Sequence, residues 1–202
     1  MFAYIKGKLE MKFQDYLVVE ANGGVGYKIF MSSNSMKKIG EIGDEIKIYT
    51  YLRVREDDIS LFGFYSNEEL RMFELLLSVS GIGAKSALGI LSNITPSNLA
   101  LAVISNDVST LKSLPGIGAK SAARMVLELK DKLKTESAVS KDVSVEVKEA
   151  IVEDNKVSEA ISALMVLGYT RKEIEQVLTK IEQKDNLSVE ELIRKSLVLL
   201  AR

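Results

Sequence analysis

The sequence predicts a multidomain protein that combines α and β structure: an N-terminal β-barrel, a central helical domain built on a repeated hairpin, and a C-terminal bundle of three helices. Residues 1–64 have the character of short strands, and residues 45–52 alternate apolar and polar side chains with the two-residue period of a half-buried strand. From Asn67 onward the apolar period becomes helical. One seven-residue motif occurs twice, at 81–87 and at 116–122.

Five short strands are expected in residues 1–64. Residues 16–20 are apolar and β-branched, the Asn-Gly-Gly at 22–24 supplies a turn, and residues 45–52 alternate as a half-buried strand does. With a brief insertion near 35–39, this pattern suits a barrel of the OB-fold type, a small barrel that binds oligonucleotides. A β-sandwich and an SH3-like barrel are the alternatives.

The central segment, residues 65–134, is expected to be a tandem of helix-hairpin-helix motifs. Thr95-Pro96 is typical of a helix start, and Asp107 can cap a short helix. A long helix is expected over 119–132. Its apolar face should hold Ala122, Met125, Val126 and Leu129.

The repeated motif, Gly-Ile-Gly-Ala-Lys-Ser-Ala, indicates an internal duplication. Glycine permits a tight turn with positive φ and leaves the backbone open to a ligand. The helix that follows offers unpaired N–H groups and the positive end of its dipole, which together bind phosphate. The isoleucines should point inward and anchor each hairpin. The candidate phosphate-binding residues are Gly81, Ile82, Gly83, Lys85, Ser86, Gly116, Ile117, Gly118, Lys120, Ser121 and Arg124.

Neither copy of the motif is a nucleotide-binding loop. The Walker pattern needs glycine directly before the lysine, where Ala84 and Ala119 stand, and the dinucleotide fingerprint needs a third glycine where Ser86 and Ser121 stand. A single such hairpin could be no more than a tight turn between packed helices. An identical pair favours DNA binding through phosphates, without reading of base sequence.

The amino-acid composition limits the kinds of catalytic and metal sites that the chain can form. Among 202 residues there is no cysteine and no histidine, which excludes disulfides and thiolate metal sites and removes the usual general base. The net charge is −1, with +2 in 65–134 and −4 in 135–155. We expect no catalytic residue, no metal and no cofactor. The apolar runs are too short to span a bilayer, so a cytoplasmic protein without a membrane partner is expected.

The C-terminal part divides into two segments. Residues 135–155 are expected to be a flexible acidic linker, and 156–202 a three-helix, UBA-like bundle. Gly168 should end its first helix, and capping boxes at 170–173 and 188–191 should open the other two. The side chains of Leu164, Met165 and Leu167 are expected in the core, which leaves any partner surface elsewhere on the bundle.

An acidic triplet, Glu56, Asp57 and Asp58, falls between two expected strands. On its own it is typical of a solvated turn.

The order of these parts resembles the RuvA family of bacterial Holliday-junction recognition proteins, over essentially the whole chain. The matching strings are Gly-Val-Gly-Tyr at 24–27, Val-Arg-Glu-Asp at 54–57, Leu-Phe-Gly-Phe at 61–64 and Leu-Pro-Gly-Ile-Gly at 114–118.

The resemblance implies a function in recombination, DNA repair and the SOS response. A homotetramer, with a second tetramer on the other face in some complexes, would hold a four-way junction open and square and grip its arms by their phosphates. Glu56 and Asp57 would form an acidic pin at the junction centre, with the part of Asp58 left open. The C-terminal bundle would recruit RuvB, a hexameric ATPase that drives branch migration, while RuvC, a junction nuclease, acts in the same pathway.

Two other classes of function stay open. Helix-hairpin-helix motifs also occur in nucleases and glycosylases, and a metal ion at 56–58 would be the simplest route to such catalysis. A general interaction protein built on the C-terminal bundle is the other class. It predicts no preference for a junction over duplex DNA at physiological salt.

Overall fold

The structure, a computed structural model, describes residues 1–139, 154–181, 184 and 187–200. The chain forms two compact units, one of Met1–Leu77 with Ile82–Thr95 and the other of Ser78–Gly81 with Pro96–Arg202. The division of the chain at 64, 134 and 155 stays a prediction.

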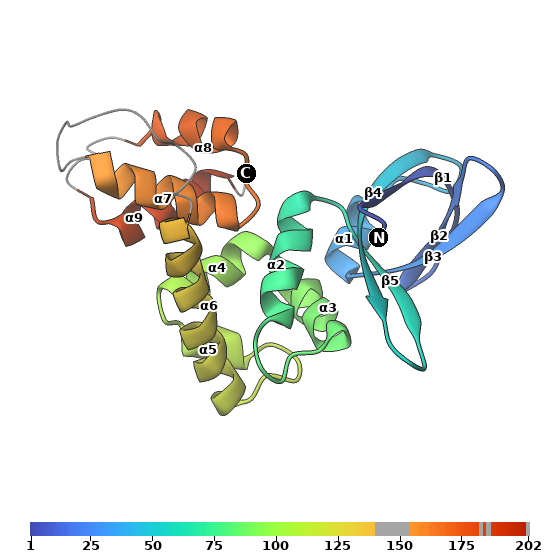
Figure 1. The fold of residues 1–202 in the computed structure, drawn as a ribbon, viewed down its shortest axis with the longest axis horizontal. Helices are drawn as coiled ribbons and strands as arrows, with labels where there is room; N and C mark the ends of the chain where they lie inside the picture. Colours follow the sequence, from blue (N-terminus) through green and yellow to red (C-terminus); the bar gives the residue numbers. More distant parts are fainter. Residues whose placement is uncertain (140–153, 182–183, 185–186, 201–202) are drawn as a thin grey trace. The chain divides into compact units, whose positions relative to one another are not determined.

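A closed barrel forms the larger part of the first unit (Figure 1). Its strands follow the order β1-β2-β3-β5-β4, with β3 and β5 parallel and the other neighbours antiparallel. The closed barrel excludes the sandwich, and its strand order with the parallel pair β3–β5 confirms the OB-fold prediction over the SH3-like barrel. The strands are β1 Tyr4–Lys12, β2 Tyr16–Ala21, β3 Val25–Met31, β4 Glu45–Val54 and β5 Ile59–Phe64.

Three helices complete the first unit: α1 Ser33–Lys38, α2 Asn67–Leu77 and α3 Ala84–Asn93. Helix α1 is the insertion expected near 35–39. Phe73 of α2 lies against three aromatic rings of the barrel, with the Phe64 ring centroid 4.8 Å away. Helix α3 is held to α1 because Ser33 N donates to Ser92 Oγ at 3.0 Å and Asn34 Nδ2 donates to Leu91 O at 2.8 Å. The first hairpin's helix is thereby fixed to the barrel.

Glu69 ties α2 to α1 and to the end of the barrel. Its side chain is 5% exposed, and its carboxylate accepts from Ser35 Oγ, from Tyr65 N at 3.0 Å and from Lys38 Nζ at 3.0 Å. Removal of this buried carboxylate takes an acceptor from each of the three donors, although Ser35 Oγ keeps its hydrogen bond with Ser32 Oγ and Lys38 is half-exposed.

Replacement of Glu69 by alanine should therefore lower the free energy of unfolding by about 2–4 kcal/mol. The matched control is Glu74→Ala on the same helix, where the carboxylate is 40% exposed and lies 3.5 Å from Arg71. That variant should cost less than about 0.5 kcal/mol. Urea unfolding of both full-length variants measures the difference, and equal losses would contradict the structural role of Glu69.

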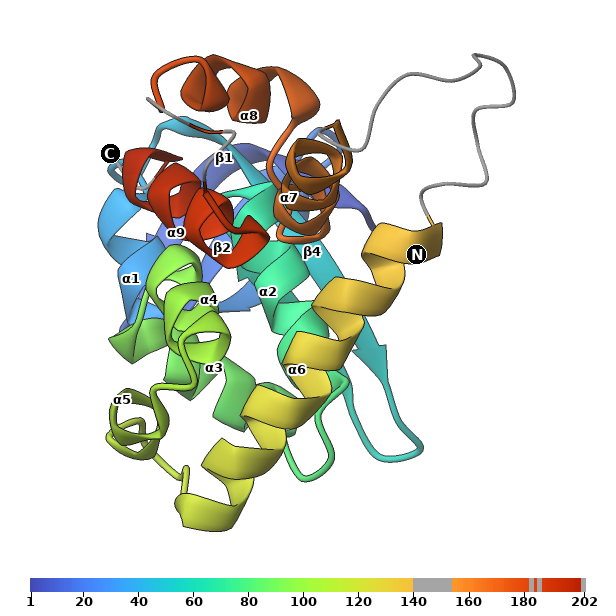
Figure 2. The same ribbon diagram turned by 90° about the vertical axis from the view of Figure 1, so that its left-hand side faces the viewer.

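Six helices make up the described part of the second unit. Figure 2 shows the long helix α6 with α4 and α5 beside it. Asp107 caps α5 as expected, since its side chain accepts from Thr110 N at 3.0 Å. The capping boxes at 170–173 and 188–191 form, and Gly168 has φ +98° after the end of α7. The helices are α4 Pro96–Ile104, α5 Val108–Lys112, α6 Ala119–Val139, α7 Asp154–Val166, α8 Arg171–Leu178 and α9 Val189–Leu200.

Two expectations for this unit need correction. Helix α6 runs to Val139 and α7 begins at Asp154, so residues 135–139 and 154–155 are helical rather than linker, and 140–153 lie outside the described residues. Met165 was expected in the bundle core, but it is 48% exposed while Leu164 is 0% and Leu167 is 2% exposed. Successive helical residues are rotated by about 100°, so a residue next to a buried leucine turns toward solvent.

Two of the C-terminal helices pack on the central helices of this unit, α7 on α6 and α9 on α4, while α8 packs on α7 and α9. Ser97 Oγ and Tyr169 Oη share a buried hydrogen bond of 2.7 Å, and Lys130 Nζ of α6 lies 3.2 Å from a carboxylate oxygen of Glu190. The bundle is therefore packed against α4 and α6. The sequence offers no local signal for this packing.

No single helix in the described part of the chain is long and apolar enough to cross a membrane. The bent pair α3–α4 passes by length and composition alone, and both helices contribute buried residues to the protein core.

Candidate nucleic-acid interface

The first glycine of each repeat makes the turn. Gly81 has φ +90° and Gly116 has φ +75°, in the left-handed region that other residues reach only with strain. Each therefore redirects the chain from the preceding helix into the start of the next one. The positive φ expected of the motif is confirmed at these two positions.

The second glycine of each repeat has a different role. Gly83 caps α3 with φ −96° and ψ 172°, without a side-chain hydrogen bond to the helix, and its carbonyl accepts from Ala87 N at 2.9 Å. Gly118 accepts from Ala122 N at the same distance, 2.9 Å. A Cβ at either glycine would meet no atom within 4 Å. The backbone at both helix N-termini is thus open to a ligand, and the orphan N–H groups of the first turn suit an anion.

The isoleucines between the glycines are buried, at 7% exposed for both Ile82 and Ile117, as expected for anchors of the hairpin. Their side chains therefore do not reach the surface. Only the backbone of these two residues can contribute to binding.

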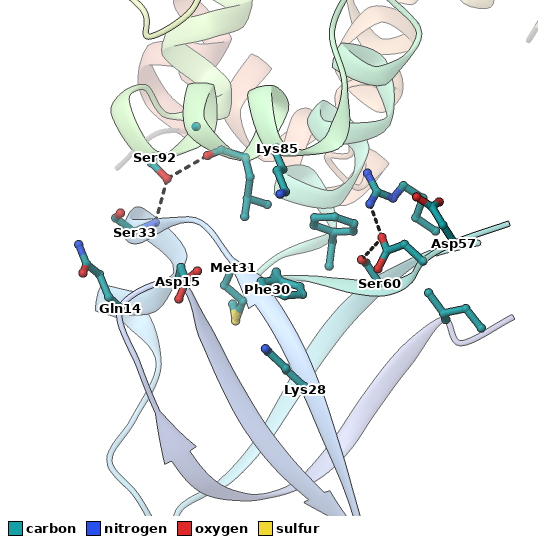
Figure 3. Close-up of a pocket in the computed structure, with 16 residues that line it drawn as sticks. Gln14, Asp15, Lys28, Phe30, Met31, Ser33, Asp57, Ser60, Lys85 and Ser92 are labelled. Carbon is teal, nitrogen blue, oxygen red and sulfur yellow. Dashed lines mark hydrogen bonds and ion pairs between the residues drawn. The ribbon is translucent and has the colours of Figure 1, made fainter. Parts of the chain in front are cut away.

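The polar side chains of the repeats differ in surroundings. Lys85, Ser86 and Lys120 are exposed, and Ser121 is half-buried. Lys85 reaches from α3 toward the barrel and lines a pocket there (Figure 3).

Arg124, predicted to contact phosphate, already has protein partners. Its Nη1 donates to Ser80 O and Ser80 Oγ, both at 3.2 Å, while Glu128 accepts from Ser80 N at 3.1 Å. Arg124 Nε lies 3.9 Å from Glu128, and the arginine side chain stays 52% exposed. In the structure, the first role of Arg124 is therefore to hold the segment that precedes Gly81. No signal near 124 in the sequence indicates this pairing.

The acidic triplet forms a tight turn between β4 and β5, closed by a hydrogen bond of 2.8 Å from Arg55 N to Asp58 O. Glu56 and Asp57 are exposed, and neither side chain has a hydrogen bond or ion pair among the described residues. At the base of the turn, Val54 and Ile59 pair across the strands and are 64% and 73% exposed. This exposed apolar pair was not expected from the sequence.

Asp58 differs from the two residues before it, because its carboxylate accepts from Ser60 Oγ at 2.6 Å and from Arg53. The hydrogen bond from Ser60, and then that from Arg53, lower the pKa of Asp58 below its ordinary value of 3.8. Asp58 therefore holds the base of the turn, and only Glu56 and Asp57 present free charge.

The lowered pKa predicts a pH dependence. An acid with a depressed folded-state pKa stabilises the fold above its ordinary pKa and loses this contribution as pH falls toward the lowered value. We therefore expect Asp58→Asn to lower the thermal unfolding midpoint at about pH 7, and the difference from wild type to narrow below pH 3.8. Calorimetry across this range measures it. A difference that persists undiminished at low pH would contradict the assignment.

Within the described ranges, no three His, Cys, Asp or Glu side chains are grouped so that they could hold a metal ion. The carboxylates at 56–58 do not converge, because Asp58 is directed to Arg53 and Ser60. The metal site on which the nuclease alternative depends is not formed by this turn.

An OB-fold barrel followed by two hairpins with open helix N-termini defines the class of tandem helix-hairpin-helix DNA-binding proteins. Family models agree along the chain: the RuvA N-terminal domain matches residues 1–63, the SAM-like helix-hairpin-helix tandem matches 73–131, and the RuvA C-terminal domain matches 155–201.

Curated relatives match over their full length. A protein of Acetivibrio thermocellus named Holliday junction branch migration complex subunit RuvA is 51% identical over 203 residues, which cover 100% of both chains. Proteins of the same name from Ruminiclostridium cellulolyticum and Clostridium perfringens (strain SM101) are 46% and 44% identical, over 98% and 100% of each chain. The chain belongs to the RuvA family.

Proposed function

We propose that this protein is a non-catalytic scaffold that binds four-way DNA junctions, holds them open and square, and recruits the RuvB ATPase for branch migration in recombination and repair. The observation that carries the proposal is the repeated hairpin, in which Gly83 and Gly118 leave the backbone N-termini of α3 and α6 open. Two such sites in one chain suit a ligand with many phosphates and no required base sequence.

In this proposal each hairpin binds one phosphate group. The backbone N–H groups that follow Gly83 and Gly118 make the direct contacts, and Lys85 and Lys120 add charge. The remaining contributors are Gly81, Ile82 and Ser86 in the first hairpin, and Gly116, Ile117 and Ser121 in the second, with Arg124 in a supporting part.

The acidic turn directs the path of the DNA strands and does not add to the affinity for DNA. Glu56 and Asp57 repel phosphates, so several copies placed around the junction centre direct strands into separate arms. This arrangement requires a homotetramer, with one or two tetramers on each junction. The exposed, unpaired state of both carboxylates supports the proposal.

The proposed function includes two partner proteins, a motor and a nuclease. The relatives are named as subunits of a branch migration complex, which supports RuvB as the motor that the C-terminal bundle recruits. The cutting of junctions is left to the nuclease RuvC. We place this activity in the cytoplasm, where a bacterial chromosome lies.

The deciding experiment compares binding of the full chain to a four-way junction and to duplex DNA of the same arm length, at physiological salt with magnesium. We expect a clear preference for the junction, intact strands, and a complex whose mass fits one or two tetramers. Equal affinity for both DNAs favours the general interaction protein, and cleaved strands favour a nuclease.

A further inference from the structure

The barrel and α3 enclose a pocket of about 1060 Å³ in the first unit (Figure 3). Its walls come from the β1–β2 loop, β3, the start of α1, the end of β4, the acidic turn, β5 and α3. The first loop, the neighbouring strands and the β4–β5 loop are the parts with which OB-fold barrels bind oligonucleotides. None of the phosphate contacts proposed above uses this pocket, apart from the side chain of Lys85.

The charges of the pocket balance. Three cationic side chains, of Lys28, Arg53 and Lys85, and three acidic ones, of Asp15, Asp57 and Asp58, line it. Arg53 is paired with Asp58. A pocket with equal opposite charges has no net attraction for a phosphate, so it suits a neutral group with polar edges.

The walls also offer a stacking surface. Phe30 is half-buried, and its ring centroid lies 6.0 Å from that of Phe62. Lys28 Nζ lies 5.0 Å from the Phe30 centroid. Figure 3 shows Phe30 and Lys28 on the barrel side of the pocket and Lys85 opposite them, on α3. An accessible aromatic ring in an OB-fold groove is typical of a base-stacking platform.

One donor in this wall lacks an acceptor. Arg53 Nε is buried and has no hydrogen-bond partner among the described residues. Buried polar groups are nearly always satisfied, so an acceptor oxygen or nitrogen that comes beside Arg53 after a small turn of its side chain would satisfy this donor. The edge of a nucleobase carries such acceptors, and an apolar ligand does not.

We propose that this pocket receives a single unpaired nucleobase, freed beside the acidic turn when a base pair opens at the junction. The inference deepens the proposed function and rests on it, because only an opened junction presents unpaired bases there. Asp57 belongs both to the turn and to the pocket wall, so a base displaced at the turn needs little movement to enter.

Two variants test the pocket while keeping the fold. Gly89→Leu adds an apolar side chain to the α3 wall of the pocket, where a Cβ meets no atom within 4 Å and leucine is a better helix former than glycine. Phe30→Leu keeps an apolar side chain but removes the aromatic face. The matched control is Tyr4→Leu, an aromatic residue of β1 that is 53% exposed and lies outside the pocket.

The first measurement uses single-stranded oligothymidylate against an abasic strand of the same length, so it does not depend on junction preference. We expect the wild type and Tyr4→Leu to bind the base-containing strand about tenfold more tightly. Gly89→Leu and Phe30→Leu should lose this preference. Equal binding of both strands by the wild type, or an unchanged preference in both pocket variants, overturns the proposal.

The second measurement places 2-aminopurine at the crossover of a four-way junction and records its fluorescence on binding. Both pocket variants should lose at most about tenfold in junction affinity, because the hairpins supply the rest, but should lose most of the fluorescence change. If the wild type shows no preference for the junction, the proposed function is wrong. The first measurement still tests whether the pocket binds a base, because it does not use a junction. If the pocket variants instead change the mass of the free assembly, a second copy of the chain fills the pocket and the proposal is overturned.

Discussion

Gly118→Thr should weaken binding to four-way and duplex DNA alike, by about 10- to 100-fold, which corresponds to loss of one charge-assisted phosphate contact. Gly118 precedes α6, and the space in the direction of its Cβ is empty. A threonine side chain would occupy this space. Its hydroxyl would also bind the N–H groups that the phosphate needs, as N-cap residues do.

The same variant should fold normally, because Gly118 has no positive φ and threonine is a good N-cap. The free energy of unfolding should stay within about 0.5 kcal/mol of the wild type. The matched control is Gly116→Ala, two residues earlier, where φ is +75°. That variant should cost about 1–2 kcal/mol of stability. Gel shifts and urea unfolding on the same samples separate the loss of DNA affinity from the loss of stability. Retained DNA affinity in Gly118→Thr would mean that the hairpin is structural only.

The features predicted correctly from the sequence depend on neighbours along the chain. Asp107, Gly168 and the two capping boxes act within one helical turn, so their residue types are sufficient to place them. The barrel strands follow from the two-residue period, and the buried isoleucines follow from an apolar residue between two turn glycines. The locations of both hairpins and of the acidic turn were therefore predictable.

Contacts between distant residues were not predictable in this way. Three sets of contacts join residues far apart in the chain: Arg124 with Ser80, Ser97 with Tyr169, and Glu69 with Ser35 and Lys38. An arginine after a glycine hairpin looks the same in sequence whether it binds phosphate or a backbone carbonyl. The different roles of the two glycines in each repeat also appear only with φ values and open space.

In the acidic turn as well, the location is predictable from the sequence, whereas the contacts of each residue are not. Three consecutive acids are equivalent in the sequence, yet Asp58 is engaged by Arg53 and Ser60 while Glu56 and Asp57 are exposed. The neutral double variant Glu56→Gln with Asp57→Asn should therefore leave the turn intact, because Asp58 still anchors it.

This double variant should bind duplex DNA about fourfold more tightly than the wild type, since two charges about 10 Å from phosphates each contribute about 0.4 kcal/mol of repulsion in water. Affinity for the junction should rise less, because the strands of an open junction pass around the acidic turn into separate arms, farther from Glu56 and Asp57. The ratio of junction to duplex affinity should therefore fall. The gain in duplex binding should shrink as salt is raised, as expected for screened charges.

The control removes the same charge at the opposite end of β4, with Glu41→Gln and Glu45→Gln. The ratio of junction to duplex affinity in this control should stay near that of the wild type. Gel shifts with both DNAs at two salt concentrations measure all three proteins. An equal gain in both double variants would show a general effect of net charge. A fall in the ratio confined to the turn variant would instead mean that Glu56 and Asp57 direct the DNA from their position, by excluding a phosphate from the place that an uninterrupted duplex would occupy.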